Sequence, residues 1–183
     1  MKRALLLLCA LVLIGCSSSS SPSAPAAQTT AAIAAPVFPS LSGVWTGTVT
    51  FANVVVSPLS QSITETCNSR WTNTQSGATF SGALTLSSST AVNATTCSGG
   101  ANYTGTVTTT AAVSIPNLND LPIGGLTWNG TPLNDATCGL RAVTAALAGT
   151  VSGRSWTMTQ QDSWLCINQS VQVDRTILVQ LTQ

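Results

Sequence analysis

Hydrophobic and polar residues alternate along much of the chain, most clearly over Leu41–Phe51. Written as a strand, this segment places Trp45, Gly47, Val49 and Phe51 on one face and mainly threonines on the other. A period of two residues is typical of a half-buried β-strand. The same unit, a large apolar residue, then Gly two positions later and Val or Leu two positions after that, recurs from Phe80, Tyr103 and Leu147. The pattern predicts an all-β domain.

In every copy of this unit the Gly shares a face with the large apolar residue. A Gly inside a strand marks a bend, a bulge or a close approach. We expect the gap that each core-facing Gly leaves to be filled by a bulky side chain from a facing strand, and the repeated glycines to permit the bending of a small barrel. The plainer interpretation is that Gly and Thr are common in short strands.

Further alternating segments separated by turn residues predict seven or eight strands in all. Their ranges are 41–51, 63–72, 79–87, 102–110, 126–128, 140–151, 154–160 and 171–182. Asn129-Gly130 is a strong hairpin signal, whereas the alanines of 140–151 would also permit a helix. Because most connections are sequential, we expect a small antiparallel up-and-down β-barrel of about eight strands, with a meandering sandwich as the alternative.

The N-terminus predicts an export signal. Lys2 and Arg3 precede the apolar run Ala4–Ile14, which is shorter than the roughly 20 residues of a membrane span. The run ends in Leu13-Ile14-Gly15-Cys16, which resembles the lipobox of bacterial lipoproteins. The resemblance implies cleavage before Cys16 and lipid attachment to it, which would hold the protein on a bilayer. The alternative is an ordinary cleavable signal with an incidental Cys.

The segment after Cys16 is rich in Ser, Ala, Pro and Thr and carries no charge, so we expect a flexible tether. The chain then divides into a signal peptide (1–15), a lipidated Cys with its tether (16–40) and a barrel domain (41–183). In enterobacterial lipoproteins an Asp after the lipidated Cys resembles an inner-membrane retention signal. Ser17 stands there in this chain, which favours the outer membrane for a Gram-negative host.

Charge and composition argue against several functions. Residues 16–183 contain four Arg and five Asp or Glu, a net charge of −1, with no Lys and no His. Without a basic patch, nucleic acid is not an expected partner. The lack of His removes His-based nucleophile pairs and imidazole metal ligands, and the scattered acids form no obvious catalytic pair. We therefore expect a protein that is not an enzyme and uses no cofactor or metal.

The domain has four cysteines, Cys67, Cys97, Cys138 and Cys166. In an exported chain they predict two disulfides, for which three pairings are possible. We favour Cys67–Cys97 and Cys138–Cys166, because sequential strands usually lie side by side. A metal site is the less favoured alternative, since the domain lacks His and closely spaced cysteines.

Arg175 shares one face of the last predicted strand with Val171, Val173, Ile177, Val179 and Leu181. A charge on an apolar face needs a partner. Trp45 would receive the guanidinium on its ring, or Glu65 would form an ion pair with it. The alternative is a bulge near Asp174 that turns Arg175 outward.

Gly43-Val44-Trp45 at the start of the first strand, with Arg175 on the last, resembles the lipocalin or wider calycin pattern. In that family a Gly-x-Trp opens the barrel and a late Arg packs across the Trp. The resemblance implies that Trp45 and Arg175, with Glu65 as the other candidate partner, close one barrel end rather than touch a ligand. No second lipocalin motif and no C-terminal helix are evident in this sequence.

The chain contains five Trp, all in or beside predicted strands. Core packing is one interpretation, and an aromatic-lined cavity for an apolar ligand is the sharper one. The possible lining residues are Trp71, Trp128, Trp156, Met158 and Tyr103. We expect a monomeric, non-catalytic lipoprotein whose barrel binds a small apolar molecule. The alternative is a protein-binding or structural envelope module with a filled barrel and exposed loop aromatics such as Trp164.

Overall fold

The computed structural model describes residues 33–58, 60–88, 97–116, 118, 126–128, 131–133, 136–168 and 170–183. The predicted signal peptide, Cys16 and most of the tether lie outside these residues, as does the Asn129-Gly130 dipeptide. For Trp128 only the backbone is described. None of the described residues belongs to a helix long and apolar enough to cross a membrane.

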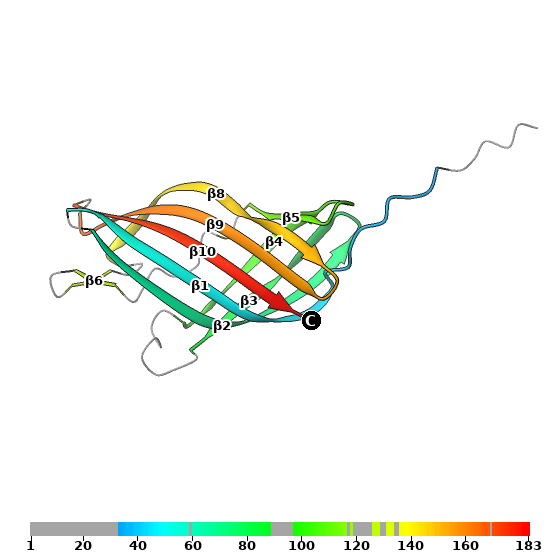
Figure 1. The fold of residues 1–183 in the computed structure, drawn as a ribbon, viewed down its shortest axis with the longest axis horizontal. Coiled ribbons are helices and arrows are strands. Elements are labelled where there is room, and N and C mark those ends of the chain that lie inside the picture. The colour runs from blue at the N-terminus through cyan, green and yellow to red at the C-terminus, as the bar shows by residue number, and fades with distance from the viewer. Residues whose placement is uncertain are drawn as a thin grey trace, which may run out of the picture. The chain divides into compact units, whose positions relative to one another are not determined.

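The described residues form ten strands and no helix, which confirms the all-β prediction. Eight strands close into a barrel in the order β1-β10-β9-β8-β5-β4-β3-β2, with every neighbouring pair antiparallel (Figure 1). The up-and-down barrel is therefore confirmed over the sandwich. The barrel strands are β1 (Gly43–Ser57), β2 (Gln61–Ser76), β3 (Thr79–Ser87), β4 (Gly100–Val107), β5 (Ala112–Ile115), β8 (Cys138–Ser152), β9 (Ser155–Cys166) and β10 (Val171–Thr182).

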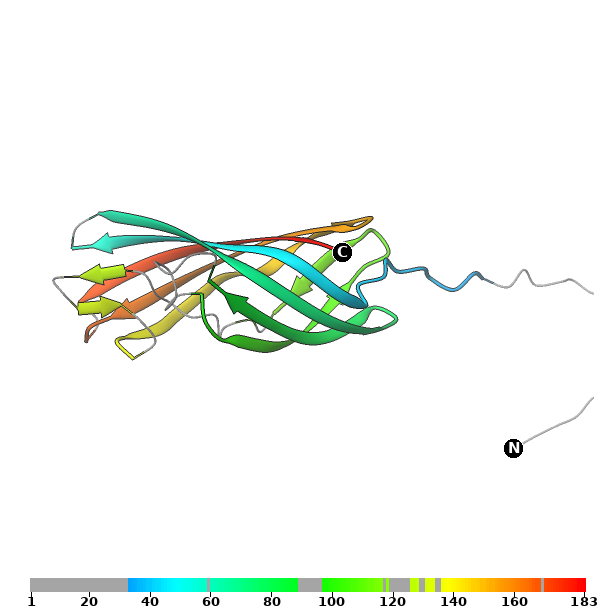
Figure 2. The same cartoon turned by 90° about the horizontal axis from the view of Figure 1, so that it is seen from below.

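The two remaining strands, β6 (Leu126–Trp128) and β7 (Thr131–Leu133), pair only with each other between β5 and β8. Figure 2 shows this hairpin at the end of the barrel where β9 is followed by β10. Leu133 is buried there against Trp164 and Val173 in a cluster of apolar side chains. The hairpin therefore covers part of that barrel end.

Several strands are longer than the sequence pattern predicts. β1 continues past Phe51 because its backbone stays paired with β2 as far as Val55 and with β10 as far as Ser57. β9 likewise continues to Cys166. In both extensions a polar residue faces inward, Asn53 in β1 and Asp162 in β9. The alternation of apolar and polar residues is interrupted there, but the backbone hydrogen bonds between the strands continue. The alternative of a helix at 140–151 is wrong, since β8 occupies this range.

The two predicted disulfides are both present. Cys67 on β2 is bonded to Cys97, which precedes β4. Cys138 and Cys166 are bonded where β8 and β9 place them directly opposite one another. The neighbour-in-sequence pairing is confirmed, because the strands of a meander lie beside the strands that follow them.

The repeated glycines allow adjacent strands to approach closely. A Cβ at Gly149 would overlap the Thr157 carbonyl oxygen on β9 and lie 2.7 Å from Met158 Cα. At Gly105 the space is taken by the ring of Phe80, directly opposite on β3. The gaps are thus filled by backbone or by a ring of the adjacent strand, and not by side chains reaching over from a facing strand as predicted.

The compact unit runs from Ala35 to Gln183 and so begins before the predicted domain boundary at Leu41. Gln75 helps to attach the residues before Leu41 to the barrel, because its Nε2 donates to Pro39 O (3.0 Å) and its Oε1 accepts from Leu41 N (2.5 Å). Phe38 also packs against the barrel core. The last residues of the predicted tether therefore contact the barrel.

Replacing Gly149 with Ala should lower the free energy of unfolding by about 3 kcal/mol, because the added methyl group meets backbone atoms that cannot rotate away. Gly139 is the matched control in the same strand. A methyl group added there would have no atom within 4 Å, so Gly139→Ala should stay within about 0.5 kcal/mol of the parent. Urea unfolding followed by Trp fluorescence measures both, and equal effects at the two positions would refute the close-approach argument.

Candidate functional site

The barrel interior contains a group of polar side chains between two apolar clusters. We call this group the polar belt and define it as Asn53, Glu65, Gln160, Asp162 and Arg175, which come from β1, β2, β9 and β10. On one side of the belt lies a large cluster that includes most of the aromatic residues, and on the other lies the cluster around Cys138–Cys166. Four belt members are at most 3 % exposed, and Glu65 is half-buried.

The register of the strands brings the belt together. Asn53 on β1 lies directly opposite Arg175 on β10, and Arg175 lies directly opposite Asp162 on β9. Glu65 is two residues beyond the position on β2 that faces Asn53. Directly opposite residues have Cβ atoms about 5 Å apart and diagonal ones about 7–8 Å apart. The belt is therefore a continuous polar strip on the inner wall.

Arg175 and Asp162 form a buried two-pronged ion pair. Arg175 Nε donates to Asp162 Oδ1 (2.9 Å), and Nη2 donates to Oδ2 (2.6 Å). Asp162 also accepts from Trp164 Nε1 (3.0 Å) and from Gln160 Nε2 (3.3 Å). Both carboxylate oxygens therefore have charged and neutral donors, which offsets the desolvation of the pair.

Two aromatic rings flank the guanidinium of Arg175. Its Cζ lies 5.0 Å from the ring centroid of Trp164 and 5.7 Å from that of Phe51. At such distances the negative ring faces attract the cation. The rings also keep water from the ion pair, which is 1 % exposed or less at both side chains.

The sequence correctly suggested a charge facing inward at Arg175, but both suggested partners were wrong. Glu65 is separated from β10 by the whole of β1. Trp45 lies eight residues along β1 from Asn53, the position opposite Arg175, which is about 26 Å of strand. Asp162 was missed because the predicted strand ended at 160. Extending the alternation from Trp156 and Met158 by four residues would have placed Asp162 on the inner face.

The calycin-like packing of Arg175 across Trp45 is also absent from the described contacts, since the rings beside Arg175 are Phe51 and Trp164. Trp45 instead packs edge-on against Trp156 with centroids 5.7 Å apart, and its Nε1 donates to Leu41 O (2.9 Å). Trp45 and Arg175 therefore belong to different levels of the barrel.

Of the predicted ligand-lining aromatics, Trp71, Trp156 and Tyr103 come together and pack against one another, whereas the side chain of Trp128 lies outside the described residues. Trp71 lies 4.9 Å from Tyr103 and 5.7 Å from Trp156, and Phe80 also lies 5.7 Å from Trp156 (centroid distances). Trp71, Trp156 and Met158 are fully buried, and Tyr103 is 4 % exposed. These side chains form a plug at this barrel level. Burial raises the pKa of the Tyr103 hydroxyl, which donates to Asn73 Oδ1.

Part of the polar belt has no hydrogen-bond partner. Both polar atoms of the Asn53 amide and Oε2 of Glu65 are buried without one. Each buried unpartnered group costs about 1–3 kcal/mol, and most buried polar groups in proteins are satisfied. By contrast, Asp162 has three donors. The belt therefore has a satisfied half on β9 and β10 and an unsatisfied half on β1 and β2.

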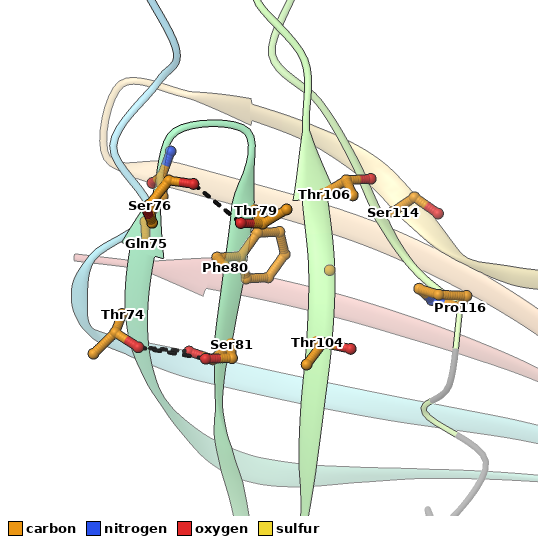
Figure 3. A pocket seen from close by; sticks show the side chains of 11 residues that line it. Thr74, Gln75, Ser76, Thr79, Phe80, Ser81, Thr104, Thr106, Ser114 and Pro116 are labelled. Carbon is orange, nitrogen blue, oxygen red and sulfur yellow. Dashed lines mark hydrogen bonds between the residues drawn. The ribbon is translucent and has the colours of Figure 1, made fainter.

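The outer wall carries a shallow groove of ≈ 590 Å³ over β2 to β5 (Figure 3). Its rim consists mainly of hydroxyl side chains, and Phe80 and Gly105 contribute to its floor. Thr74 and Ser81 hydroxyls lie 3.4 Å apart and Thr79 donates to Ser76 O, as the dashed lines in Figure 3 show. Among the described residues that line the groove, none has a charged or titratable side chain, and their hydroxyl groups offer hydrogen bonds.

Trp164 is 6 % exposed and belongs to the cluster around Cys138–Cys166. It is therefore not the exposed loop aromatic that the protein-binding alternative called for. Within the part of the chain that the structure describes, no three Cys, Asp or Glu side chains gather where they would hold a metal ion.

No protein-family model and no curated protein matches the sequence. A solved structure described as the monomer form of the M. tuberculosis PknI sensor domain aligns with 79 % of this chain and 88 % of its own length, at 11 % identity and a TM-score of 0.34. A TM-score this low supports no conclusion about function.

Replacing Arg175 with Met should lower the free energy of unfolding by about 3–5 kcal/mol, because Asp162 would remain buried without its counter-charge. Combining it with Asp162→Leu should give a protein more stable than either single variant. Arg141→Gln is the control, because Arg141 is exposed and its loss should change stability by less than about 0.5 kcal/mol. Urea melts in which Arg175→Met matches the parent would exclude a stabilising pair.

Proposed function

We propose that this protein is a lipid-anchored lipoprotein of the bacterial envelope whose barrel holds a small ligand at the polar belt without catalysing a reaction. The observation that carries the proposal is the Asn53 amide, which is 1 % exposed and has neither a donor nor an acceptor within hydrogen-bond reach. An inward-facing amide beside a satisfied ion pair is suited to a ligand that completes its hydrogen bonds.

The expected position of the ligand changes with the packing of the aromatic residues. Trp71, Trp156 and Tyr103 are in mutual contact, so they have less surface to offer an apolar guest than the sequence suggests. The belt offers unpartnered donors and acceptors together, on Asn53 and Glu65, whereas Trp71 and Trp156 offer only one unpartnered N–H group each. We therefore place the ligand at the belt and assign it polar groups.

The envelope location rests on the N-terminal sequence. The basic pair Lys2-Arg3, the apolar run and Leu13-Ile14-Gly15-Cys16 support export and lipidation at Cys16, and Ser17 supports the outer membrane. The uncharged segment that follows would let the barrel stand away from the bilayer. We also propose that the protein is a monomer.

A second candidate function is the binding of an envelope protein through the outer wall. The observation that favours it is the groove of ≈ 590 Å³ over β2 to β5, whose described lining residues are uncharged and rich in hydroxyl groups. In this function the barrel interior would be a filled scaffold and the ligand-free belt would hold water. The two functions differ in whether the purified protein carries a small molecule.

Native mass spectrometry of the full-length protein, purified from bacterial envelopes, tests the first candidate. We expect a species heavier than the lipidated chain by the mass of one small molecule, because the belt retains its ligand. The Asn53→Leu variant should lose that added mass. A parent protein that carries no added mass, and that recovers an envelope protein in pull-downs, would favour the second candidate.

Replacing Cys16 with Ala tests the anchor. The parent should appear in the membrane fraction and incorporate labelled palmitate, whereas Cys16→Ala should incorporate none and appear in the soluble fraction, because no acyl chain is attached. Cys9→Ala, which changes a cysteine of the predicted signal peptide, is the control and should behave as the parent. Labelling that persists in Cys16→Ala would overturn the lipobox assignment.

A further inference from the structure

We infer that the ligand of the polar belt is a small primary amine with a hydroxyl or carbonyl oxygen two or three bonds from the amine-bearing carbon. This inference rests on the proposed function and adds the chemical class of the ligand. It follows from three properties of the unsatisfied half of the belt: its charge, its pattern of donors and acceptors, and the spacing of Asn53 and Glu65.

The charge of the belt favours a cation. Of its three ionisable side chains, Arg175 and Asp162 neutralise each other through two short hydrogen bonds. Glu65 adds a further carboxylate, and its Oε2 is buried with no hydrogen-bond partner. A carboxylate oxygen removed from water is best stabilised by a charged donor. An ammonium group at Glu65 would supply both the charge and the donor.

The donors and acceptors of the belt then specify the rest of the ligand. Asn53 Oδ1 lacks a donor and Asn53 Nδ2 lacks an acceptor. An ammonium has three N–H groups and no acceptor, so it would serve Glu65 and Asn53 Oδ1 together and leave Nδ2 unsatisfied. An oxygen on the same ligand would accept from Nδ2. A ligand that satisfies all three atoms is therefore an amine that also has an oxygen able to accept a hydrogen bond.

The spacing of Asn53 and Glu65 suits a short ligand. Asn53 faces Ile63, and Glu65 follows Ile63 by two residues on the same inner face, so the two Cβ atoms are diagonal neighbours about 7–8 Å apart or less. An atom between two such side chains can accept or donate at ordinary distances of about 2.8–3.0 Å to both. A longer molecule would meet Phe51, which lies directly opposite Glu65.

Other ligand classes fit the belt less well. An anion would meet Glu65, and the two Arg175 nitrogens that face Asp162 are already engaged. A neutral polyol would leave the Glu65 charge uncompensated. A quaternary ammonium would match the charge but has no N–H for Glu65 or Asn53. These differences make close chemical analogues informative.

Isothermal titration of the full-length protein with ethanolamine, ethylene glycol and choline tests the inference. Ethanolamine has the ammonium and the hydroxyl, ethylene glycol lacks the charge, and choline lacks the N–H groups. We expect ethanolamine to bind at least about tenfold more tightly than either analogue, since a hydrogen bond to a charged group contributes about one to two powers of ten. Equal affinity for ethanolamine and ethylene glycol would overturn the inference.

Variants of the belt separate its chemistry from the net charge of the protein. Glu65→Gln should weaken ethanolamine binding at least about tenfold. Asp174→Asn is the matched control, because Asp174 is exposed on the outer face beside Arg175 and its loss removes the same charge without touching the belt. If the two variants weaken binding equally, the site is not at Glu65 and the inference fails.

Stability distinguishes a ligand from structural water. Asn53→Leu should abolish ethanolamine binding and leave the midpoint of urea unfolding of the ligand-free protein unchanged or higher, because it removes two unsatisfied polar atoms and keeps the branching and number of side-chain heavy atoms. A lower midpoint, with no amine bound by the parent, would show that ordered water completes the belt. That result would overturn the inference.

The results also separate this inference from the proposed function. A neutral or anionic molecule found in the purified protein would overturn the amine and leave the proposed ligand-binding function standing. The absence of any bound molecule, together with no ethanolamine binding, would overturn both.

Discussion

The structure depends on the ion pair between Arg175 and Asp162, because this pair can form in only one register of β9 against β10. The two residues lie directly opposite each other and face inward. A slip of one residue in either strand would turn one charge to the outer face and leave the other buried alone, an outcome that costs several kcal/mol. Asn53, directly opposite Arg175 on β1, extends the same row. The pair therefore helps to specify how three neighbouring strands are aligned.

The glycine-containing unit meets a second constraint, the closure of a small barrel. At Gly149 an adjacent strand comes closer than any side chain would allow, and at Gly105 the Phe80 ring takes the vacated space. The large residue two positions earlier in each unit is buried in the same apolar cluster. One short sequence pattern thus supplies both the close approach of the strands and the rings that fill the interior. The aromatic plug and the glycines therefore both follow from the need to close and fill a narrow barrel.

The barrel tolerates the polar belt because the remainder of the domain is strongly held. Disulfides join β2 to the segment before β4 and β8 to β9, and the apolar clusters on either side of the belt are almost fully buried. A scaffold of this kind can accommodate unsatisfied polar groups, which are found where a protein departs from its best packing for the sake of function. Under the proposed function Asn53 and Glu65 would be such a departure, and they lie beside a network in which both oxygens of Asp162 accept hydrogen bonds.

The sequence by itself determined the properties that depend on neighbouring residues: the strand class from the period of two, the meander from short connections, the pairing of cysteines on sequential strands, and the inward direction of Arg175. It did not determine which side chain Arg175 meets, how far β1 and β9 extend, or that Trp71 and Trp156 contact each other. Asn53 and Asp162 are polar and yet face inward, so they interrupt the alternation from which strands are recognised. Asp162 meets Arg175 through the register of β9 with β10, which follows it in the chain. Asn53 meets Arg175 only through the pairing of the first strand with the last, and that pairing exists only when the barrel has closed.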